Sequence, residues 1–459
     1  MAGANHEDRP EAAPEPMPKA GPEVVSQARC ETRRSARRGA QHGIAVLMVL
    51  VCLAVLLPFT ASFNYSARVD WQAAVNNADE VKARNLQRGA LRLSVLLFEL
   101  QRLVFNQRQF REYMGPMDIT QVAPYLMSIF GSQDGGEGVG ALLGINTEAL
   151  SDLAIAEGSF EVRIDAESGR LNVNCLAVEK SGKNRPRERT IEVIEAMLMP
   201  TLYDPLFDEE KSDGRRYTRE NVLNALVDYI DDDRRKYDLV RLRSRGTPED
   251  YRYRELRDPY DARNARLDSV QELHLVEGID DDWMAAFGSE LTVYGHCKVN
   301  LNFASADQLA LVIRHAARGD QRELVSGENF LLKTLPLANF VVEAREFSLF
   351  KSVGEFQKLV RYPDQYVNPM TFFGQQEEND SMLPKVPEGI ITQLTSGSND
   401  DGEWGGIKDM ATVAPERVYR VEVTTEIGAV RKRATAVYDL KYGRNQSKGR
   451  GAWLYFRED

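Results

Sequence analysis

The sequence lacks the short motifs that mark common enzyme active sites. It has no HExxH, GxSxG or P-loop pattern, and no GxGxxG motif follows a predicted strand. Histidine is scarce, with five in 459 residues. His296 and Cys297 are neighbours, but adjacent residues of a strand point to opposite faces, so we do not expect a catalytic dyad. The sequence therefore favours a protein that is not an enzyme.

Cysteine is also scarce, with four in the chain. Cys30 and Cys52 lie in the N-terminal part, and only Cys175 and Cys297 lie beyond residue 63. Outside the cytoplasm these two could form a disulfide, whereas two buried free thiols are the alternative. The sequence leaves both possibilities open.

Charge is absent from Ile44 to Phe63. Twenty helical residues span about 30 Å, the thickness of the hydrocarbon core of a bilayer. The apolar run is too long for a secretory signal, and Ala61-Ser62 is a poor cleavage site for one. Four arginines precede the run, at positions 33, 34, 37 and 38. The positive-inside rule therefore predicts a single span with a cytoplasmic N-terminus and the bulk of the chain on the other side.

The remaining composition limits the partners that the chain can bind. The formal net charge is −11, and residues 44–459 alone carry −12. An acidic domain of this kind is a poor candidate for binding nucleic acid or anionic lipid through charge. Residues 1–43 are rich in Pro, Ala and Glu and lack apolar periodicity, so we expect them to be disordered.

No proline occurs between Pro58 and Pro116, and this stretch has helical periodicity. We expect one long helix over 44–107, kinked at Pro58. Its predicted apolar stripe consists of Val81, Leu86, Ala90, Leu93, Leu97, Leu100 and Val104.

Beyond this helix the pattern predicts an α+β body interrupted by an all-helical domain. Alternation over 159–175 predicts a β-hairpin. From about 187 to 320 the pattern is helical, with predicted caps at Thr218, Ser269 and Ser305. The chain then ends in strands, the first of which places Tyr419, Val421, Val423 and Ile427 on one face.

Three acidic clusters could hold a cation. Asp231–Asp233 and Asp280–Asp282 follow predicted helix-end signals, so we interpret them as capping or solvating helix ends. The third cluster lies in a glycine-flanked loop and provides Asn399, Asp400, Asp401 and Glu403. Their hard oxygen ligands are those that Ca²⁺ prefers, so this loop is the predicted metal site.

Two segments, LHLVEGID and KVNLNFASADQL, have the pattern of helix-hairpin-helix motifs, which bind DNA phosphates through backbone N–H groups. Here the first hairpin carries Glu277 and Asp280–Asp282, which would repel phosphate. We therefore expect these motifs to pack helices.

Several of these segments, in this order, resemble the K-type minor pseudopilins of bacterial type II secretion (general secretion pathway protein K). RRGAQHGIAVLMVLVCLAVL resembles a prepilin-peptidase leader with its anchor, and NADEVKARNLQRGALRLSVLLFELQ resembles the continuation of the family's helix. The other matching segments are LNVNC, LVDYIDDD, YDARN, LDSVQELHLVEGI, VNLNFASADQLALVI and AWLYFRED.

The resemblance implies cleavage after Gly43 and a mature, N-methylated chain that begins at Ile44. Most pilins carry Glu at the fifth position of the mature chain. This chain has Met48 there, and the absence of the acid suits a subunit at the filament tip. The residues of the implied assembly helix are Met48, Pro58, Val81, Leu86, Leu93 and Leu97. The family also implies bound Ca²⁺, for which the loop at 399–403 is the candidate.

The implied fold is a long transmembrane helix, a pseudopilin α/β body with an antiparallel sheet, and an inserted SAM/helix-hairpin-helix-like domain. The expected divisions are a leader (1–43), a transmembrane helix (44–64), a periplasmic helix (65–110), the first part of the body (111–186), a helical insert (187–320) and the second part of the body (321–459).

The implied function is to nucleate the type II secretion pseudopilus at its tip and to support export of folded proteins across the outer membrane. The implied location is the inner membrane, with the bulk of the chain in the periplasm. Expected partners are the I-, J- and H-type minor pseudopilins, the major pseudopilin, the prepilin peptidase and the inner-membrane assembly platform, with the secretin or cargo as further candidates. Two alternatives are a type IV pilus minor pilin and a membrane-tethered helix-hairpin-helix module.

Overall fold

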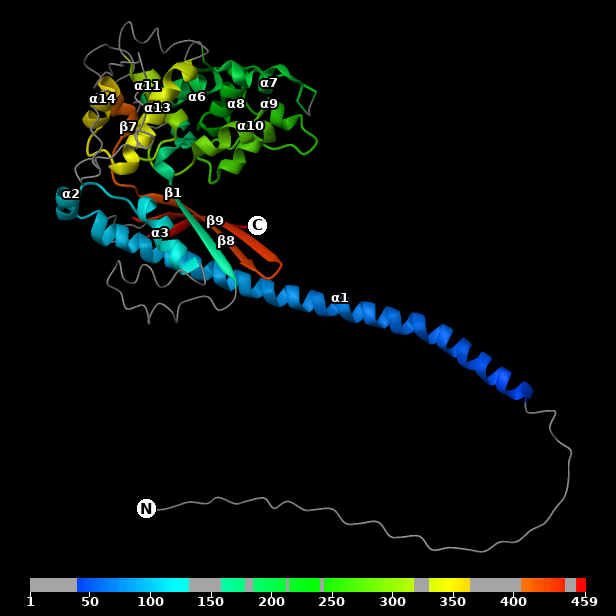
Figure 1. The fold of residues 1–459 in the computed structure, drawn as a ribbon. Coiled ribbons are helices and arrows are strands. Elements are labelled where there is room, and N and C mark those ends of the chain that lie inside the picture. The colour runs from blue at the N-terminus through cyan, green and yellow to red at the C-terminus, as the bar shows by residue number, and fades with distance from the viewer. Residues whose placement is uncertain are drawn as a thin grey trace, which may run out of the picture. The chain divides into compact units, whose positions relative to one another are not determined.

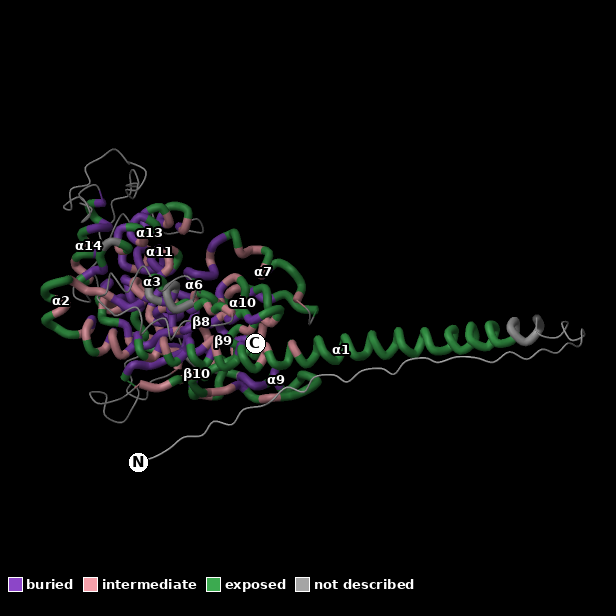
Figure 2. Tube along the Cα trace, turned by 60° about the horizontal axis from the view of Figure 1, so that its bottom comes forward, coloured by how far each residue is buried: buried purple, intermediate pink, exposed green. Residues whose placement is uncertain are grey.

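The computed structural model describes residues 39–131, 158–177, 185–211, 214–239, 243–317, 330–363, 406–441 and 451–459. The chain divides into two compact units, residues 1–73 and residues 74–459. One helix, α1 (Gly39–Leu100), contains residues of both units. In the first unit every residue from 44 to 73 is exposed, as the green tube of Figure 2 shows.

The second unit contains a four-stranded antiparallel sheet with the order β1-β8-β9-β10. Its strands are β1 (Ser159–Ala166), β8 (Val418–Ile427), β9 (Val430–Asp439) and β10 (Ala452–Glu458). After α1 the chain continues through a π-helical turn, η1 (Gln101–Phe105), and through α2 (Arg108–Met114) and α3 (Ile119–Gly131). The C-terminal part of α1 and α3 run along the sheet (Figure 1), and their apolar side chains share one core with it.

The predicted C-terminal strands are confirmed, and β8 buries Tyr419, Val421, Val423 and Ile427 as the alternation indicates. The predicted hairpin at 159–175 is wrong. β1 pairs with β8, whereas Leu171–Asn172 forms β2, which pairs in parallel with β5 (Leu291–Thr292). The strand stops there because the Asn172 side chain accepts a hydrogen bond from the Asn174 N–H, which begins a 3₁₀ turn.

A second core lies among the helices of the unit. Its helices are η2 (Glu167–Gly169), η3 (Val173–Leu176), α6 (Arg185–Leu198), η4 (Thr201–Tyr203), α7 (Asp204–Asp208), α8 (Arg219–Ile230), α9 (Tyr251–Arg254), η5 (Val270–Leu275), α10 (Asp281–Phe287), η6 (Gly288–Glu290), α11 (Ala306–Ala316), α13 (Phe330–Phe347), α14 (Val353–Arg361) and α15 (Ile407–Met410). Two short ladders accompany them, β3 (Arg235–Asp238) with β4 (Arg243–Pro248) and β6 (Val299–Asn300) with β7 (Ala411–Thr412).

The predicted caps are confirmed. Thr218 accepts a hydrogen bond from Asn221 N–H, Ser269 forms a capping box with Glu272, and Ser305 accepts one from Gln308 N–H. The helical core extends beyond the predicted limits of 187 and 320, because it includes Leu171 before them and Phe356 after them. The chain is thus an α+β protein, as expected, with one core under the sheet and one among the helices.

Candidate functional site

The N-terminal part of α1 is the first candidate for function. Among the residues that the structure describes, α1 is the one helix that is long and apolar enough to cross a membrane, with a mean hydropathy of 2.8. Gly43, Ile44, Met48 and Pro58 all lie within this continuous helix. Their roles in cleavage, tip placement and kinking stay predictions.

The apolar stripe of α1 is displaced from its predicted position. Val81 is 52% exposed, Leu86 and Leu93 are half-buried, and of the six predicted assembly residues only Leu97 is buried. The buried stripe consists of Ala83, Gln87, Ala90, Leu91, Ser94, Leu97, Phe98, Gln101 and Phe105. The side of the helix that is buried within this chain differs from the predicted apolar stripe because three of its side chains are polar, and the role of the stripe in assembly stays a prediction.

Two of these polar side chains have partners that make their burial favourable. Ser94 Oγ donates a hydrogen bond to Ala90 O at 3.0 Å. Gln101 Nε2 donates to Asn106 Oδ1, while its Oε1 accepts from Ile119 N–H at 2.7 Å. Gln101 therefore joins the end of α1 to the start of α3.

In the helical part, Cys175 and Cys297 form a disulfide with a Cα–Cα distance of 5.7 Å. Of the two states that the sequence left open, the structure therefore has the disulfide. The bond joins η3 to the segment before β6 across 122 residues. It also occupies the sulfur of Cys297, the neighbour of His296.

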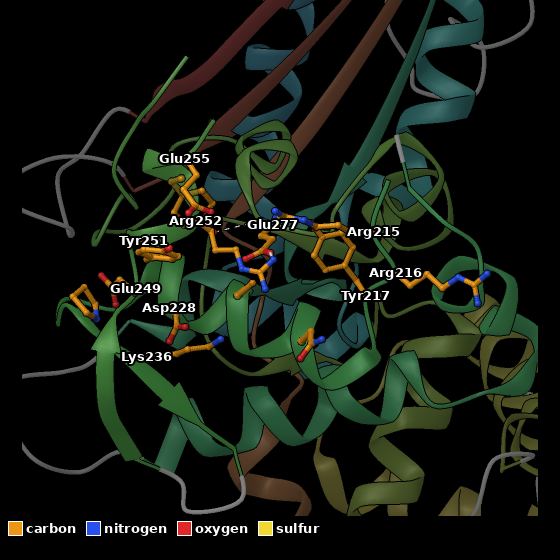
Figure 3. Close-up of a pocket in the computed structure, with 14 residues that line it drawn as sticks. Arg215, Arg216, Tyr217, Asp228, Lys236, Glu249, Tyr251, Arg252, Glu255 and Glu277 are labelled. Atoms are coloured by element: carbon orange, nitrogen blue, oxygen red, sulfur yellow. Dashed lines mark hydrogen bonds and ion pairs between the residues drawn. The ribbon is translucent and has the colours of Figure 1, made fainter. Parts of the chain in front are cut away.

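A cavity with a volume of about 740 Å³ lies between α8, α9 and β4. Figure 3 shows Asp228, Lys236 and Glu249 at one end, whereas Arg215 and Arg216 lie across the cavity. Arg252 and Glu277, also on its wall, form an ion pair at 2.6 Å.

An acidic cluster adjoins this cavity. Asp231, Asp233 and Glu249 each place a carboxylate oxygen so that the three atoms lie within 4.8 Å of one another. Asp231 is fully buried, and one of its oxygens pairs with Arg187 at 2.6 Å. Oxygen is the ligand atom that hard cations such as Ca²⁺ prefer, so the donor set fits such an ion.

Burial shifts the acidity of this region. It raises the pKa of Asp228 to about 7, that of Asp231 to about 6 and that of Glu249 to about 8. The neighbouring carboxylates raise each pKa further, while Arg187 lowers that of Asp231. Burial and mutual repulsion therefore favour the protonated, neutral form of these carboxyl groups.

The two helix-hairpin-helix segments pack into the helical core. They contribute Leu273, Val276, Ile279, Leu301 and Leu309 to it. Asp280 caps α10 and pairs with Lys211 at 2.7 Å. Gly278 has φ +82°, and a Cβ at this position would lie 3.0 Å from Tyr217 and Val222. This turn is therefore packed closely against α8.

The predicted Ca²⁺ ligands Asn399, Asp400, Asp401 and Glu403 lie outside the described residues. The acidic cluster is a site that sequence reasoning missed. Asp231 does terminate α8, as expected, but it also faces Glu249, which is 18 positions later in the chain. The sequence does contain a signal for this cluster. Asp231 and Asp233 are separated by one residue, and a further acidic pair, Glu249 and Asp250, follows later in the chain.

Comparisons with known proteins find similarity over part of the chain. A family model described as "Type II secretion system (T2SS), protein K", first domain, matches residues 169–296. A search of curated proteins gives no match. Among solved structures, the crystal structure of the GspK-GspI-GspJ complex from the type 2 secretion system of enterotoxigenic Escherichia coli has a TM-score of 0.38 and 13% identity, covering 66% of this chain and 81% of that one.

Proposed function

We propose that the chain is a minor pseudopilin of the protein K type of the type II secretion system, as the match of residues 169–296 supports, and that it stands at the tip of the pseudopilus and starts filament assembly. It is a minor pseudopilin, a structural subunit and not an enzyme. The observation that carries the proposal is α1, which joins the uncharged run at 44–63 to a buried stripe that packs on the sheet in the second unit.

The uncharged run would serve first as a membrane anchor. A prepilin peptidase would cut after Gly43 on the cytoplasmic side, and Ile44 would become the methylated N-terminus. Because the cut precedes the apolar run, the anchor is retained. The four arginines before it keep the leader in the cytoplasm, so the second unit lies in the periplasm.

Within the membrane, this helix would associate with those of other pseudopilins mainly through van der Waals packing. Met48 supplies no carboxylate for the N-terminal amine of a neighbouring subunit, so this chain has less reason to pack beneath another subunit. The exposed Val81 and Leu96 extend an apolar surface outside the membrane that partner helices could cover. The I-, J- and H-type minor pseudopilins and the major pseudopilin are the proposed partners in the filament.

The helical part would then crown the filament, where it could meet the secretin or cargo. In this account the inner-membrane assembly platform adds subunits below, and the growing filament pushes folded proteins outward through the outer membrane.

Deletion of the gene in its own bacterium tests this function. We expect export of type II substrates to stop while pili and twitching persist, and the wild-type gene to restore export. Loss of pili with export retained would instead identify a type IV pilus minor pilin. Salt-dependent binding of the purified chain to duplex DNA would favour the tethered helix-hairpin-helix module.

A further inference from the structure

A groove with an apolar floor lies between α6 and α8 in the helical part. The two helices pack side by side (Figure 1), and the groove has a volume of about 580 Å³. Ile191, Leu198 and Leu223 are buried at its floor, with Met199 and Leu239 half-buried beside them. None of the residues that line it belongs to the acidic cluster at the end of α8. The groove therefore forms a separate apolar surface on this part of the protein.

Glutamate side chains border the apolar floor. Glu188, Glu192 and Glu195 follow one another along α6 at spacings of four and three residues, which places them on one face of the helix. Glu220 of α8 also lines the groove. Glu195 and Glu220 are exposed, and Glu188 is half-buried. This rim, the four glutamates together, presents negative charge to a molecule that enters the groove.

The protein itself neutralises little of this charge. The glutamates at positions 188, 195 and 220 form no ion pair with any residue that the structure describes. Glu192, the fourth, has His315 Nδ1 at 3.4 Å from its Oε2. Most of the charge on the rim is therefore available to a partner.

Arg219 also lines the groove, but its guanidinium is already engaged. Its Nε donates to Leu198 O at 2.6 Å, and its Nη2 pairs with Asp204 Oδ1 at 2.5 Å. The guanidinium carbon lies 4.5 Å from the centre of the Phe207 ring. These contacts hold the wall of the groove in place before a partner arrives, which lowers the entropic cost of binding.

These features are complementary to one class of partner. In an amphipathic helix with basic flanks, apolar side chains can fill the groove while Lys or Arg side chains meet the glutamates. The stretch of α6 from 188 to 195 is about 10 Å long, enough for two apolar anchors one helical turn apart. Nucleic acid and anionic lipid would be repelled. A second copy of the chain is poorly matched, since residues 44–459 carry a net charge of −12.

We propose that the groove between α6 and α8 docks a basic amphipathic helix of a partner protein. Two apolar side chains of that helix occupy the floor, and its Lys or Arg side chains pair with Glu188, Glu195 and Glu220. The proposal does not depend on the tip function proposed above, since peptide binding is measured without secretion.

The test titrates a labelled helical peptide into the full chain in non-ionic detergent micelles, and fluorescence anisotropy gives the affinity. The probe is alanine-based, with two leucines one turn apart and lysines beside them, and a titration of empty micelles is subtracted. One control peptide has alanine in place of both leucines, and another has glutamate in place of the lysines. The protein variants are Glu188→Gln/Glu195→Gln on the rim and Glu161→Gln, an exposed acid of β1, as matched control.

We expect the probe to bind the wild-type chain and the Glu161→Gln control with the same affinity, and more weakly as salt is added. Both control peptides should bind far more weakly than the probe. Neither rim side chain of the double variant is buried or ion-paired, so this variant should fold. It should bind the probe about fivefold or more weakly, as the loss of two partly exposed ion pairs implies.

Should the double variant fail to fold, Glu220→Gln decides, because that side chain is exposed on the other helix. No saturable binding by the wild-type chain, equal affinity of the wild-type chain and the deciding rim variant, or equal binding of the probe and the alanine control peptide would each overturn the proposal. Self-association of the wild-type chain that the rim variant loses would assign the groove to a second copy, and would overturn it as well.

Discussion

The ring of Phe98 in α1 stacks on Tyr419 in β8, with ring centroids 5.0 Å apart. Phe98 also stacks on Tyr438 of β9 at 5.0 Å, and the Tyr419 hydroxyl donates a hydrogen bond to Asp118 Oδ2 at 2.9 Å. One aromatic side chain thus joins the long helix to the two central strands. This contact fixes how the second part of α1 lies on the sheet.

Truncation of Phe98 should therefore destabilise the second unit strongly. Phe98 is 1% exposed, so Phe98→Ala leaves a cavity and should lower the free energy of unfolding by about 3–5 kcal/mol. Leu96→Ala is the matched control, because Leu96 is 64% exposed, and it should change stability by less than about 0.5 kcal/mol. Urea unfolding of the full chain in detergent measures both. Equal losses for the two variants would mean that Phe98 does not anchor α1 to the sheet.

The disulfide should contribute to the stability of the helical part. It closes a loop across 122 residues, and loss of a native disulfide typically costs about 2–5 kcal/mol. The Cys175→Ser/Cys297→Ser variant should unfold at a lower temperature than the wild-type chain. Cys52→Ser, which removes the free cysteine of the described residues, should have no such effect. If a reductant lowers the Tm of the wild-type chain and of the double variant equally, the bond contributes nothing.

The turn at Gly278 should tolerate no side chain. Alanine there would have an unfavourable φ of +82° and would also press on Tyr217 and Val222. Gly246 separates the two effects, since its φ is +101° but nothing lies within 4 Å of an added Cβ. We expect Gly278→Ala to lower the Tm more than Gly246→Ala does. Similar shifts would show that the backbone angle alone limits both positions.

Asp118 should make stability depend on pH. Burial raises the pKa of this carboxyl above its ordinary value of 3.8, although its hydrogen bonds with Thr120 and Tyr419 oppose the shift. Its contribution to stability is therefore full below pH 3.8 and is lost as pH rises through the raised pKa. Asp118→Asn should show a smaller fall in Tm over this window than the wild-type chain. The exposed Glu161→Gln is the control, and a wild-type slope in Asp118→Asn would contradict the assignment.

The sequence predicts those features that local periodicity and capping determine. β8 and β9 alternate apolar and polar residues, and Thr218, Ser269 and Ser305 precede their helices, so these elements follow from local rules. The partner of β1 does not follow from such rules, because alternation shows a strand without showing its neighbour. The true partner, β8, is more than 250 residues away along the chain.

The other errors have the same origin in distant contacts. Gln101, the first residue of η1, looks like a surface residue, but it is buried because Ile119 N–H and Asn106 satisfy its amide. Asp231 looks like a helix cap, and the structure shows that it also faces Glu249. Polarity alone could not reveal either role, because each depends on a residue brought close by the fold.

The most direct test of the pseudopilin account is the intact mass and N-terminal sequence of the chain extracted from membranes. It should be measured in cells with an active prepilin peptidase and in cells without one. The account predicts a methylated chain that begins at Ile44 only when the peptidase is active. An uncut leader in both kinds of cell would contradict it.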